Sequence, residues 1–174
     1  MRGWRFAFHL FLWHVVDIIG MVKKRWNKPK TDNAFLNDVS FIVFVVRFNY
    51  RVVEMKWPQI TKAFHGFDIQ KLAKMDENDL DVFLKAPGMI KNKWKMQSVL
   101  INAKKCVEIQ KQHGGVLKWI AKAKKELKDS PMLALELRTL FKESFRGIGP
   151  MTSTWLESLF MSDKPYVEYE MPDK

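Results

Sequence analysis

The sequence FRGIGPMTS, residues 145–153, places two glycines one residue apart, directly before a proline. Upstream, Ser130 and Pro131 are typical of a helix start, and apolar residues at helical spacing follow them. Downstream, Pro150 begins a second segment whose apolar residues also keep helical spacing. The stretch therefore predicts a tight turn between two helices, in a hairpin that covers about residues 131–161.

A turn of this kind has the parts of an anion-binding site. Glycines have no Cβ, so the backbone can approach a ligand closely, and the first N–H groups of a helix have no partner within it. Such N–H groups attract phosphate. We therefore predict that Gly147, Ile148, Gly149, Met151 and Thr152 form a site for one phosphate group. The alternative is an ordinary helix connection that a glycine closes.

The charge of the chain points to a polyanionic partner. The 174 residues suffice for one domain, or for one domain with a short extension, and carry a formal charge of +11. The segment from Lys85 to Lys128 holds twelve lysines and two acids. Such a concentration favours nucleic acid or an anionic membrane as the partner, although a lysine-rich face that only meets solvent is a common alternative.

Cysteine usage indicates the compartment. Cys106 is the single cysteine, which excludes a disulfide within this sequence and any cysteine-rich zinc site. Its position in an amphipathic run predicts a thiol in the core. A reducing compartment is the simplest interpretation, and we expect a cytoplasmic protein, associated with the nucleoid if the cell is bacterial or archaeal.

Residues 6–22, FAFHLFLWHVVDIIGMV, are almost entirely apolar and nearly long enough to span a bilayer. Placed at about 100° per residue, however, the polar residues in and around this stretch gather on about half of a helix circumference. We therefore favour an amphipathic helix followed by a basic connection, together residues 1–30. The alternatives are a membrane anchor or uncleaved signal, and an extension upstream of a translation start at Met21.

The remaining residues, 31–174, are predicted to form one all-α domain. Residues 34–48 are rich in β-branched side chains, but a lone strand among helices would have no partner, so we predict a buried helix. The longest helix is expected from Ile90 to Gln112, with Trp94 among its apolar residues, and Gly114 and Gly115 stop it. The pattern gives about eight to ten helices and no strand.

Several stretches, in order from about residue 31 to residue 160, resemble the DNA-3-methyladenine glycosylase I family, a branch of the helix-hairpin-helix DNA glycosylases. The matching stretches are KWP at 56–58, AFHGFD at 63–68, LAKM at 72–75 with Asp79, GMIKNK at 88–93 with Lys95, INA at 101–103 and FRGIGPMT at 145–152. The resemblance implies a helix-hairpin-helix glycosylase fold and a monofunctional hydrolase for DNA repair. Such an enzyme binds damaged double-stranded DNA and excises an alkylated purine, such as 3-methyladenine, by hydrolysis of the N-glycosidic bond. We expect a monomer without a cofactor.

The resemblance also suggests where an extruded base would lie. In that family a helix with a glutamate and a following Gln-Ala-Gly-Leu-x-Trp run reads the base, and the aligned stretch here is IVFVVRFNY, residues 42–50. Tyr50 aligns with the family's tryptophan, which stacks on the base, so Tyr50 is expected to stack on the base here. Ile42 aligns with the family's glutamate, which reads the base. An isoleucine cannot accept a hydrogen bond from adenine. Asp173 lies near the spacing at which many other helix-hairpin-helix glycosylases place a catalytic aspartate.

For the DNA strand beside the hairpin we predict contacts with Lys91, Lys93 and Lys95. The family's structural zinc uses cysteines and histidines near both termini, whereas Cys106 is central and no histidine or cysteine follows His113, so we predict no metal. Two alternatives to a glycosylase remain open. The loss of the glutamate at Ile42 favours a catalytically impaired DNA-binding protein, and residues 6–22 favour a basic helical protein that associates with an anionic membrane.

Overall fold

Eight α-helices and one short 3-10 helix account for most of residues 28–161, which are the residues that the computed structural model describes. None of these residues lies in a strand, so the all-α prediction is confirmed. Their contacts join Pro29–Glu157 into one compact unit. Among residues 28–161 no helix has both the length and the apolar character that a membrane crossing requires. The predicted helix at residues 6–22 and the candidate Asp173 lie outside the described residues.

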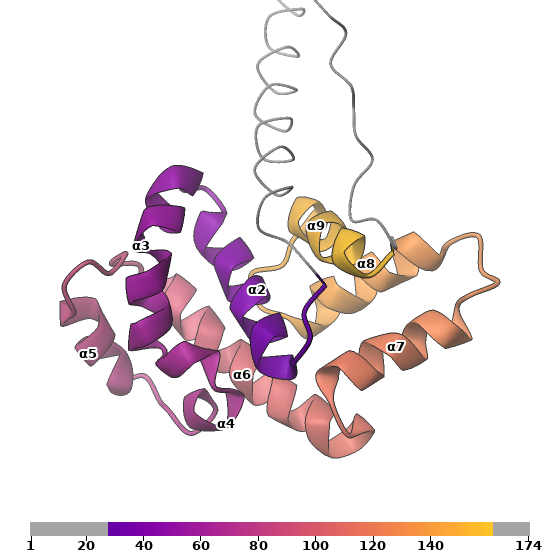
Figure 1. The fold of residues 1–174 in the computed structure, drawn as a ribbon, viewed down its shortest axis with the longest axis horizontal. Coiled ribbons are helices and arrows are strands. Elements are labelled where there is room, and N and C mark those ends of the chain that lie inside the picture. Colours follow the sequence, from indigo (N-terminus) through magenta and orange to yellow (C-terminus); the bar gives the residue numbers. More distant parts are fainter. Residues whose placement is uncertain (1–27, 162–174) are drawn as a thin grey trace, which may run out of the picture. The chain divides into compact units, whose positions relative to one another are not determined.

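Helix α2 (Asp32–Val45) is the centre of the unit. It begins after Thr31, whose hydroxyl accepts a hydrogen bond from the Ala34 N–H at 3.1 Å. It lies between α3, α4 and α5 on one side and α7 and α8 on the other (Figure 1). Because helices surround it, side chains on several of its faces are buried: Phe35, Leu36, Val39, Ser40, Phe41, Ile42, Val43, Phe44 and Val45. Burial has overridden the β propensity of the segment, and the predicted buried helix is confirmed.

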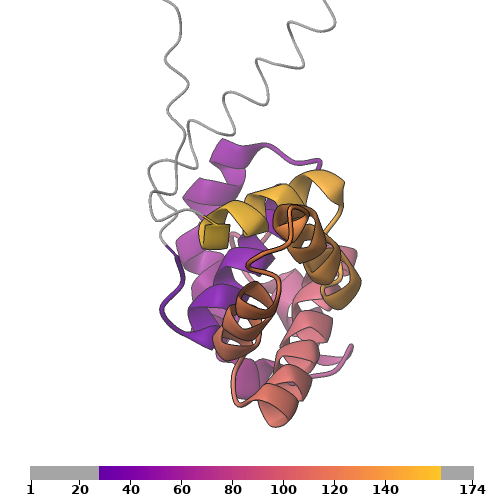
Figure 2. The same cartoon turned by 90° about the vertical axis from the view of Figure 1, so that its right-hand side faces the viewer.

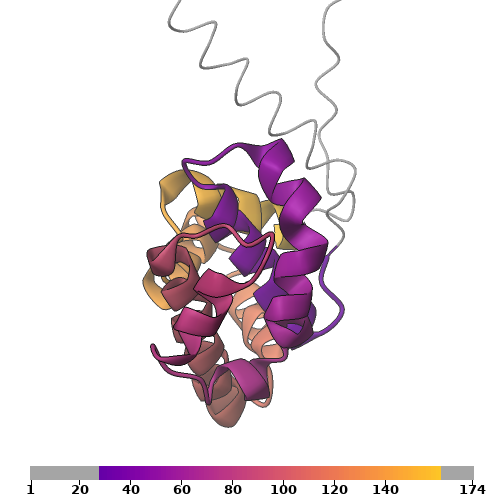
Figure 3. The same cartoon turned by 90° about the vertical axis from the view of Figure 1, so that its left-hand side faces the viewer.

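An aromatic cluster joins α2 to the helices on one side. These are α3 (Tyr50–Ala63), the 3-10 helix η1 (His65–Phe67), α4 (Ile69–Leu72) and α5 (Asp79–Lys85), which Figure 3 shows from that side. Trp57 lies at the centre of the cluster, with ring centroids 4.9 Å from Phe41 and 5.3 Å from Phe67. Helix α3 continues through Pro58, although proline is more typical of the first turn of a helix. The cluster fixes the end of α2 relative to α3.

Helix α6 (Lys93–His113) crosses beneath α2, and α7 (Val116–Glu126), α8 (Leu133–Ser144) and α9 (Pro150–Met161) follow it. Figure 2 shows the side on which α7 and α8 lie. Gly114, with φ +73°, ends α6 in the left-handed conformation, as the sequence predicted. The Cys106 thiol is fully buried in α6, and burial, together with the charge of Asp32, raises its pKa to about 12. The interpretation of Cys106 as a core thiol is therefore confirmed.

Asp32 joins the start of α2 to the start of α7. Its carboxylate accepts hydrogen bonds from the Val116 N–H at 2.9 Å, the Leu117 N–H at 3.0 Å and the Gln110 amide at 2.8 Å. Burial alone would raise the pKa of Asp32, but these hydrogen bonds and the nearby Lys118 lower it below the ordinary value. A residue at the beginning of the domain thus supplies the N-terminal cap of a helix 84 residues later in the chain.

Candidate nucleic-acid interface

A tight turn joins helices α8 and α9, as the sequence predicted. Gly147 has φ +85°, a conformation that favours glycine. A Cβ at this position would lie 2.9 Å from Val43 Cγ2 and 3.3 Å from Trp94 Cη2. The glycine is therefore required both by the backbone conformation and by close packing against α2 and α6.

Asn102 of α6 holds the turn from within the protein. Its side-chain NH2 donates to the Arg146 carbonyl at 3.0 Å, and its carbonyl oxygen accepts from the Arg146 N–H at 2.7 Å. The side chain is fully buried. Two hydrogen bonds from one buried amide fix the position of the turn. No role for Asn102 was predicted from the sequence, although a polar residue on the buried side of the longest helix was a signal for one.

The start of α9 leaves backbone donors available. The Gly149 N–H donates to Thr152 Oγ1 at 2.7 Å, and the Ile148 N–H donates to the Phe145 carbonyl at 3.3 Å, so both groups are used within the turn. Within residues 28–161, the N–H groups of Met151 and Thr152 have no acceptor. Met151 is 61% exposed, so this helix start faces solvent. An exposed helix N-terminus with two unpaired donors can bind an anion.

Beside the turn, Trp94 and Arg146 form a surface pair. The Arg146 guanidinium carbon lies 5.6 Å from the centroid of the Trp94 ring. The Trp94 side chain is 44% exposed, although its spacing in the sequence places it among the apolar residues of the helix. Lys91 and Lys93, which lie just before Trp94 in the sequence, are exposed as well. Lys93 makes an ion pair at 4.0 Å with Glu77, and the side chains of both residues are largely exposed.

Lys95 is buried, which corrects the prediction that it contacts the DNA strand. It is only 5% exposed, and its ammonium donates to the carbonyls of Val43 at 2.9 Å, Phe44 at 2.6 Å and Val46 at 2.5 Å. The last carbonyls of a helix have no partner within it, and Lys95 supplies one for the end of α2. Burial lowers the pKa of Lys95 to about 8. The side chain that looked like a phosphate contact thus caps a helix.

Ile42 and Tyr50, the two positions aligned with the family's base-reading residues, are both packed inside the protein. Ile42 is fully buried, and Tyr50 is 8% exposed with its ring 5.4 Å from the Phe41 ring in an edge-on contact. Between them the chain turns at Arg47, with φ +53°, and leaves Phe48 43% exposed. The described conformation therefore presents Phe48, and not Tyr50, to solvent at the end of α2.

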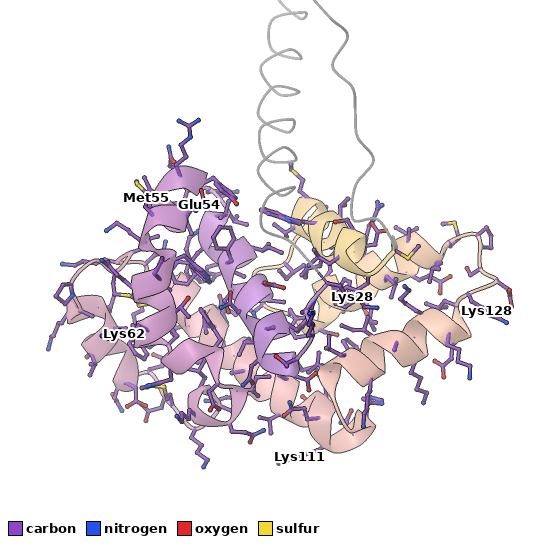
Figure 4. All side chains as sticks on the ribbon, viewed as in Figure 1. Lys28, Glu54, Met55, Lys62, Lys111 and Lys128 are labelled. Atoms are coloured by element: carbon purple, nitrogen blue, oxygen red, sulfur yellow. The ribbon has the colours of Figure 1, made fainter. Side chains whose placement is uncertain are left out.

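Lysines are exposed far from the turn as well as near it. Lys62, Lys111 and Lys128 point outward at well separated parts of the periphery (Figure 4). A cleft between α7 and α8 is lined by none of the predicted site residues; its lining residues are Ala123, Glu126, Leu127, Met132, Leu135, Glu136, Thr139, Leu140 and Glu143. Residues 28–161 contain no group of three or more His, Cys, Asp or Glu side chains that could hold a metal ion.

Comparisons with known proteins agree on one family. A family model described as methyladenine glycosylase matches residues 17–153. The DNA-3-methyladenine glycosylase of Haemophilus influenzae is 29% identical over 89 residues, which are 51% of this chain and 48% of that protein. The chain thus matches about half of the length of this curated relative.

Solved structures of glycosylases share the fold. A point mutant of 3-methyladenine DNA glycosylase I from Staphylococcus aureus superimposes with a TM-score of 0.67 at 18% identity, over 81% of this chain and 84% of that chain. A single-residue variant of 3-methyladenine DNA glycosylase I in complex with 3-methyladenine gives a TM-score of 0.67 at 18% identity, over 90% and 89% of the two chains. At these identities the likeness establishes the helical fold.

Proposed function

Because the chain belongs to the methyladenine glycosylase family, we propose that it binds double-stranded DNA and removes an alkylated purine of the 3-methyladenine class. The observation that carries this proposal is the exposed start of α9, where the Met151 and Thr152 N–H groups have no acceptor among the described residues. A DNA phosphate supplies the acceptor that these groups lack, and the positive end of the helix dipole attracts it.

The chemistry is hydrolysis of a glycosidic bond. The damaged nucleotide must leave the base stack before its bond can be reached. The C–N bond between sugar and base breaks, and the base leaves with the electron pair. Water adds its hydroxyl to the sugar C1′ and gives its proton to solvent. A purine methylated at N3 is cationic and leaves as a neutral base, so the protein has to extrude and position the nucleotide more than it has to activate the leaving group.

In this proposal the hairpin fixes one phosphate and Lys91 and Lys93 neutralise neighbouring ones. Asn102 keeps the turn in the conformation that presents the donors. A protein with this function must reach the genome, so we propose a cytoplasmic protein, associated with the nucleoid if the cell is bacterial or archaeal. We propose that it acts as a monomer, because one hairpin is sufficient to hold one phosphate.

A second candidate, DNA binding without base excision, is favoured by one observation. Ile42 is fully buried and carries no group that can hydrogen bond to a base. In the described conformation the end of α2 therefore offers neither a carboxylate at this position nor an accessible ring at Tyr50. Excision by this chain requires that the segment between Val45 and Tyr50 rearrange when DNA binds.

Release of free base from alkylated duplex DNA separates the two candidates. The assay compares the parent protein with Gly149→Asp, because a Cβ at Gly149 meets no heavy atom within 4 Å, whereas one at Gly147 meets Val43 and Trp94. The proposed enzyme releases 3-methyladenine, and the variant releases much less. A parent protein that binds this DNA and releases no base is the second candidate; a parent that does not bind DNA overturns both.

A further inference from the structure

Trp94 is a large aromatic side chain that the fold leaves exposed beside the hairpin. It lies in the first turn of α6 and is 44% exposed, while the next residue, Lys95, is buried. The edge of the ring packs towards Gly147, and the Arg146 guanidinium lies over the ring at 5.6 Å. These contacts restrain the ring and leave much of its surface open. Aromatic side chains in such a position are typical of binding surfaces.

The position of Trp94 relative to the proposed phosphate site restricts what it can bind. Trp94 contacts the two residues, Arg146 and Gly147, that shortly precede the start of α9. A nucleotide whose phosphate lies on the Met151 and Thr152 amides therefore has its sugar and base close to this ring. Arg146 on the ring adds a cation beside that phosphate. The chemistry of the surface is that of a positively charged aromatic platform, which suits a nucleic-acid base.

Bases in intact duplex DNA are covered on both faces by their neighbours, so an aromatic ring on the outside of the duplex cannot stack on them. A ring can stack only on a base that is unpaired, at a strand end, at a gap or in a single strand. We infer that Trp94 stacks on an unpaired base next to the phosphate that the hairpin holds. The protein then binds DNA with an unstacked nucleotide at this place more tightly than intact duplex. This inference rests on the proposed binding of DNA through the hairpin, and it concerns a base other than the one that is excised.

Two variants at Trp94 and one control test the inference. Trp94→Ala removes the ring, and Trp94→Phe retains a smaller aromatic face. Leu135→Ala is the control, because Leu135 is also half exposed, at 50%, and lies on α8 in the wall of the cleft between α7 and α8. The side chains at both positions are about half exposed, so all three proteins are expected to fold. Melting curves check this before binding is measured.

Binding of the full chain is measured with three probes of one sequence, namely a single strand, an intact duplex and a duplex with a one-nucleotide gap. Trp94→Ala should weaken binding to the single strand and the gapped duplex by about 5- to 150-fold, and binding to the intact duplex by less than about threefold. Trp94→Phe should recover most of the loss, and Leu135→Ala should bind like the parent. The salt dependence of Trp94→Ala should equal that of the parent, because the ring carries no charge.

The inference is wrong if Trp94→Ala binds all probes like the parent, or if it weakens binding to all probes equally. It is also wrong if Leu135→Ala weakens binding in the same way as Trp94→Ala. An equal weakening would mean that Trp94 only positions Arg146. Failure of the proposed function gives a different pattern, because a parent that binds none of the probes, or a Gly149→Asp protein that binds them like the parent, removes the hairpin from the DNA interface whatever Trp94 does.

Discussion

At the scale of single residues, burial decides which predicted site residues are available to a ligand. Lys95 and Lys93 are two positions apart in a lysine-rich segment, and the sequence gives no reason to separate them. In the folded chain one caps the end of α2 and the other faces solvent. The partners of Lys95 lie about fifty residues away in sequence. Only tertiary packing brings them together, so local pattern could not predict this capping contact.

Lys95→Met should therefore destabilise the protein. The variant keeps the aliphatic stem but leaves the carbonyls of Val43, Phe44 and Val46 without their donor. Buried groups left unpaired typically reduce the free energy of unfolding by about 2–4 kcal/mol in total. Urea unfolding measures the change, with Lys93→Met as the matched control that should stay within about 0.5 kcal/mol of the parent. Equal stability of the two variants would contradict the capping role of Lys95.

Ile42→Glu tests whether this position is core or pocket. Ile42 is fully buried, so a carboxylate there is buried without a partner and should reduce the free energy of unfolding by about 3–5 kcal/mol. Ile42→Val is the control and should cost about 0.5–1.5 kcal/mol. Thermal melting distinguishes them. An Ile42→Glu protein as stable as Ile42→Val would show that the side chain reaches solvent or a cavity that a base can enter.

At the scale of helices, capping residues that are visible in the sequence account for the starts of several elements. Thr31, Asn49, Asp68 and Asn92 each accept a hydrogen bond from a backbone N–H near the start of the helix that follows. Proline is typical of a helix start, yet Pro58 lies inside α3. The hairpin was predicted correctly because glycine and proline act through the local backbone. The contact of Asn102 with the turn could not be predicted in this way, because its partner Arg146 lies 44 residues away in the sequence.

The stability of the contact between α2 and α7 depends on pH through the carboxylate of Asp32. Its pKa is lowered in the folded protein from the ordinary value of 3.8, so the stability that it contributes is fully present above about pH 3.8 and is lost as the pH falls through the lower folded value. Asp32→Asn removes the charge and replaces one acceptor by a donor. We expect Asp32→Asn to be less stable than the parent at pH 7, by about 1–2 kcal/mol.

The difference in melting temperature between the parent and Asp32→Asn should shrink as the pH is lowered from about 5 towards about 2, because the parent's carboxylate is protonated in that range. Asp129→Asn is a suitable control, because Asp129 is exposed and its side chain lies in an exposed pair with Lys128 at 3.9 Å. A difference between parent and Asp32→Asn that stays constant over the whole acid range would contradict the capping role of the Asp32 carboxylate.

At the scale of the whole molecule, the positive charge makes binding to DNA strongly dependent on salt. The sequence locates the charge along the chain but not on the surface, and the lysines of Figure 4 point in several directions. Net charge alone therefore cannot identify the DNA-binding face. At the exposed start of α9, with Trp94 beside the turn that precedes it, unpaired backbone donors occur on a basic surface.

Replacing Lys91 and Lys93 together by glutamine should reduce the slope of log K against log salt for duplex DNA by up to about 1.8, which is roughly 0.9 for each phosphate that the variant no longer neutralises. The control replaces Lys104 and Lys111, two exposed lysines further along the same helix. Lys111 lies about 27 Å from Lys93 at about 1.5 Å per helical residue. Titrations at several salt concentrations give the slopes. Equal slopes for the two double variants would remove Lys91 and Lys93 from the DNA interface.

The central claim, that the start of α9 holds a DNA phosphate, is tested most directly by the affinity of Gly149→Asp and Gly149→Asn for one duplex at one salt concentration. Position 149 has room for either side chain, and both residues are favourable caps for α9. They have nearly the same shape, and only aspartate places a negative charge where the phosphate would bind. We predict that both variants melt at or above the temperature of the parent, and that Gly149→Asp binds DNA about tenfold or more weakly than Gly149→Asn. Equal affinities of these two folded proteins would contradict the claim.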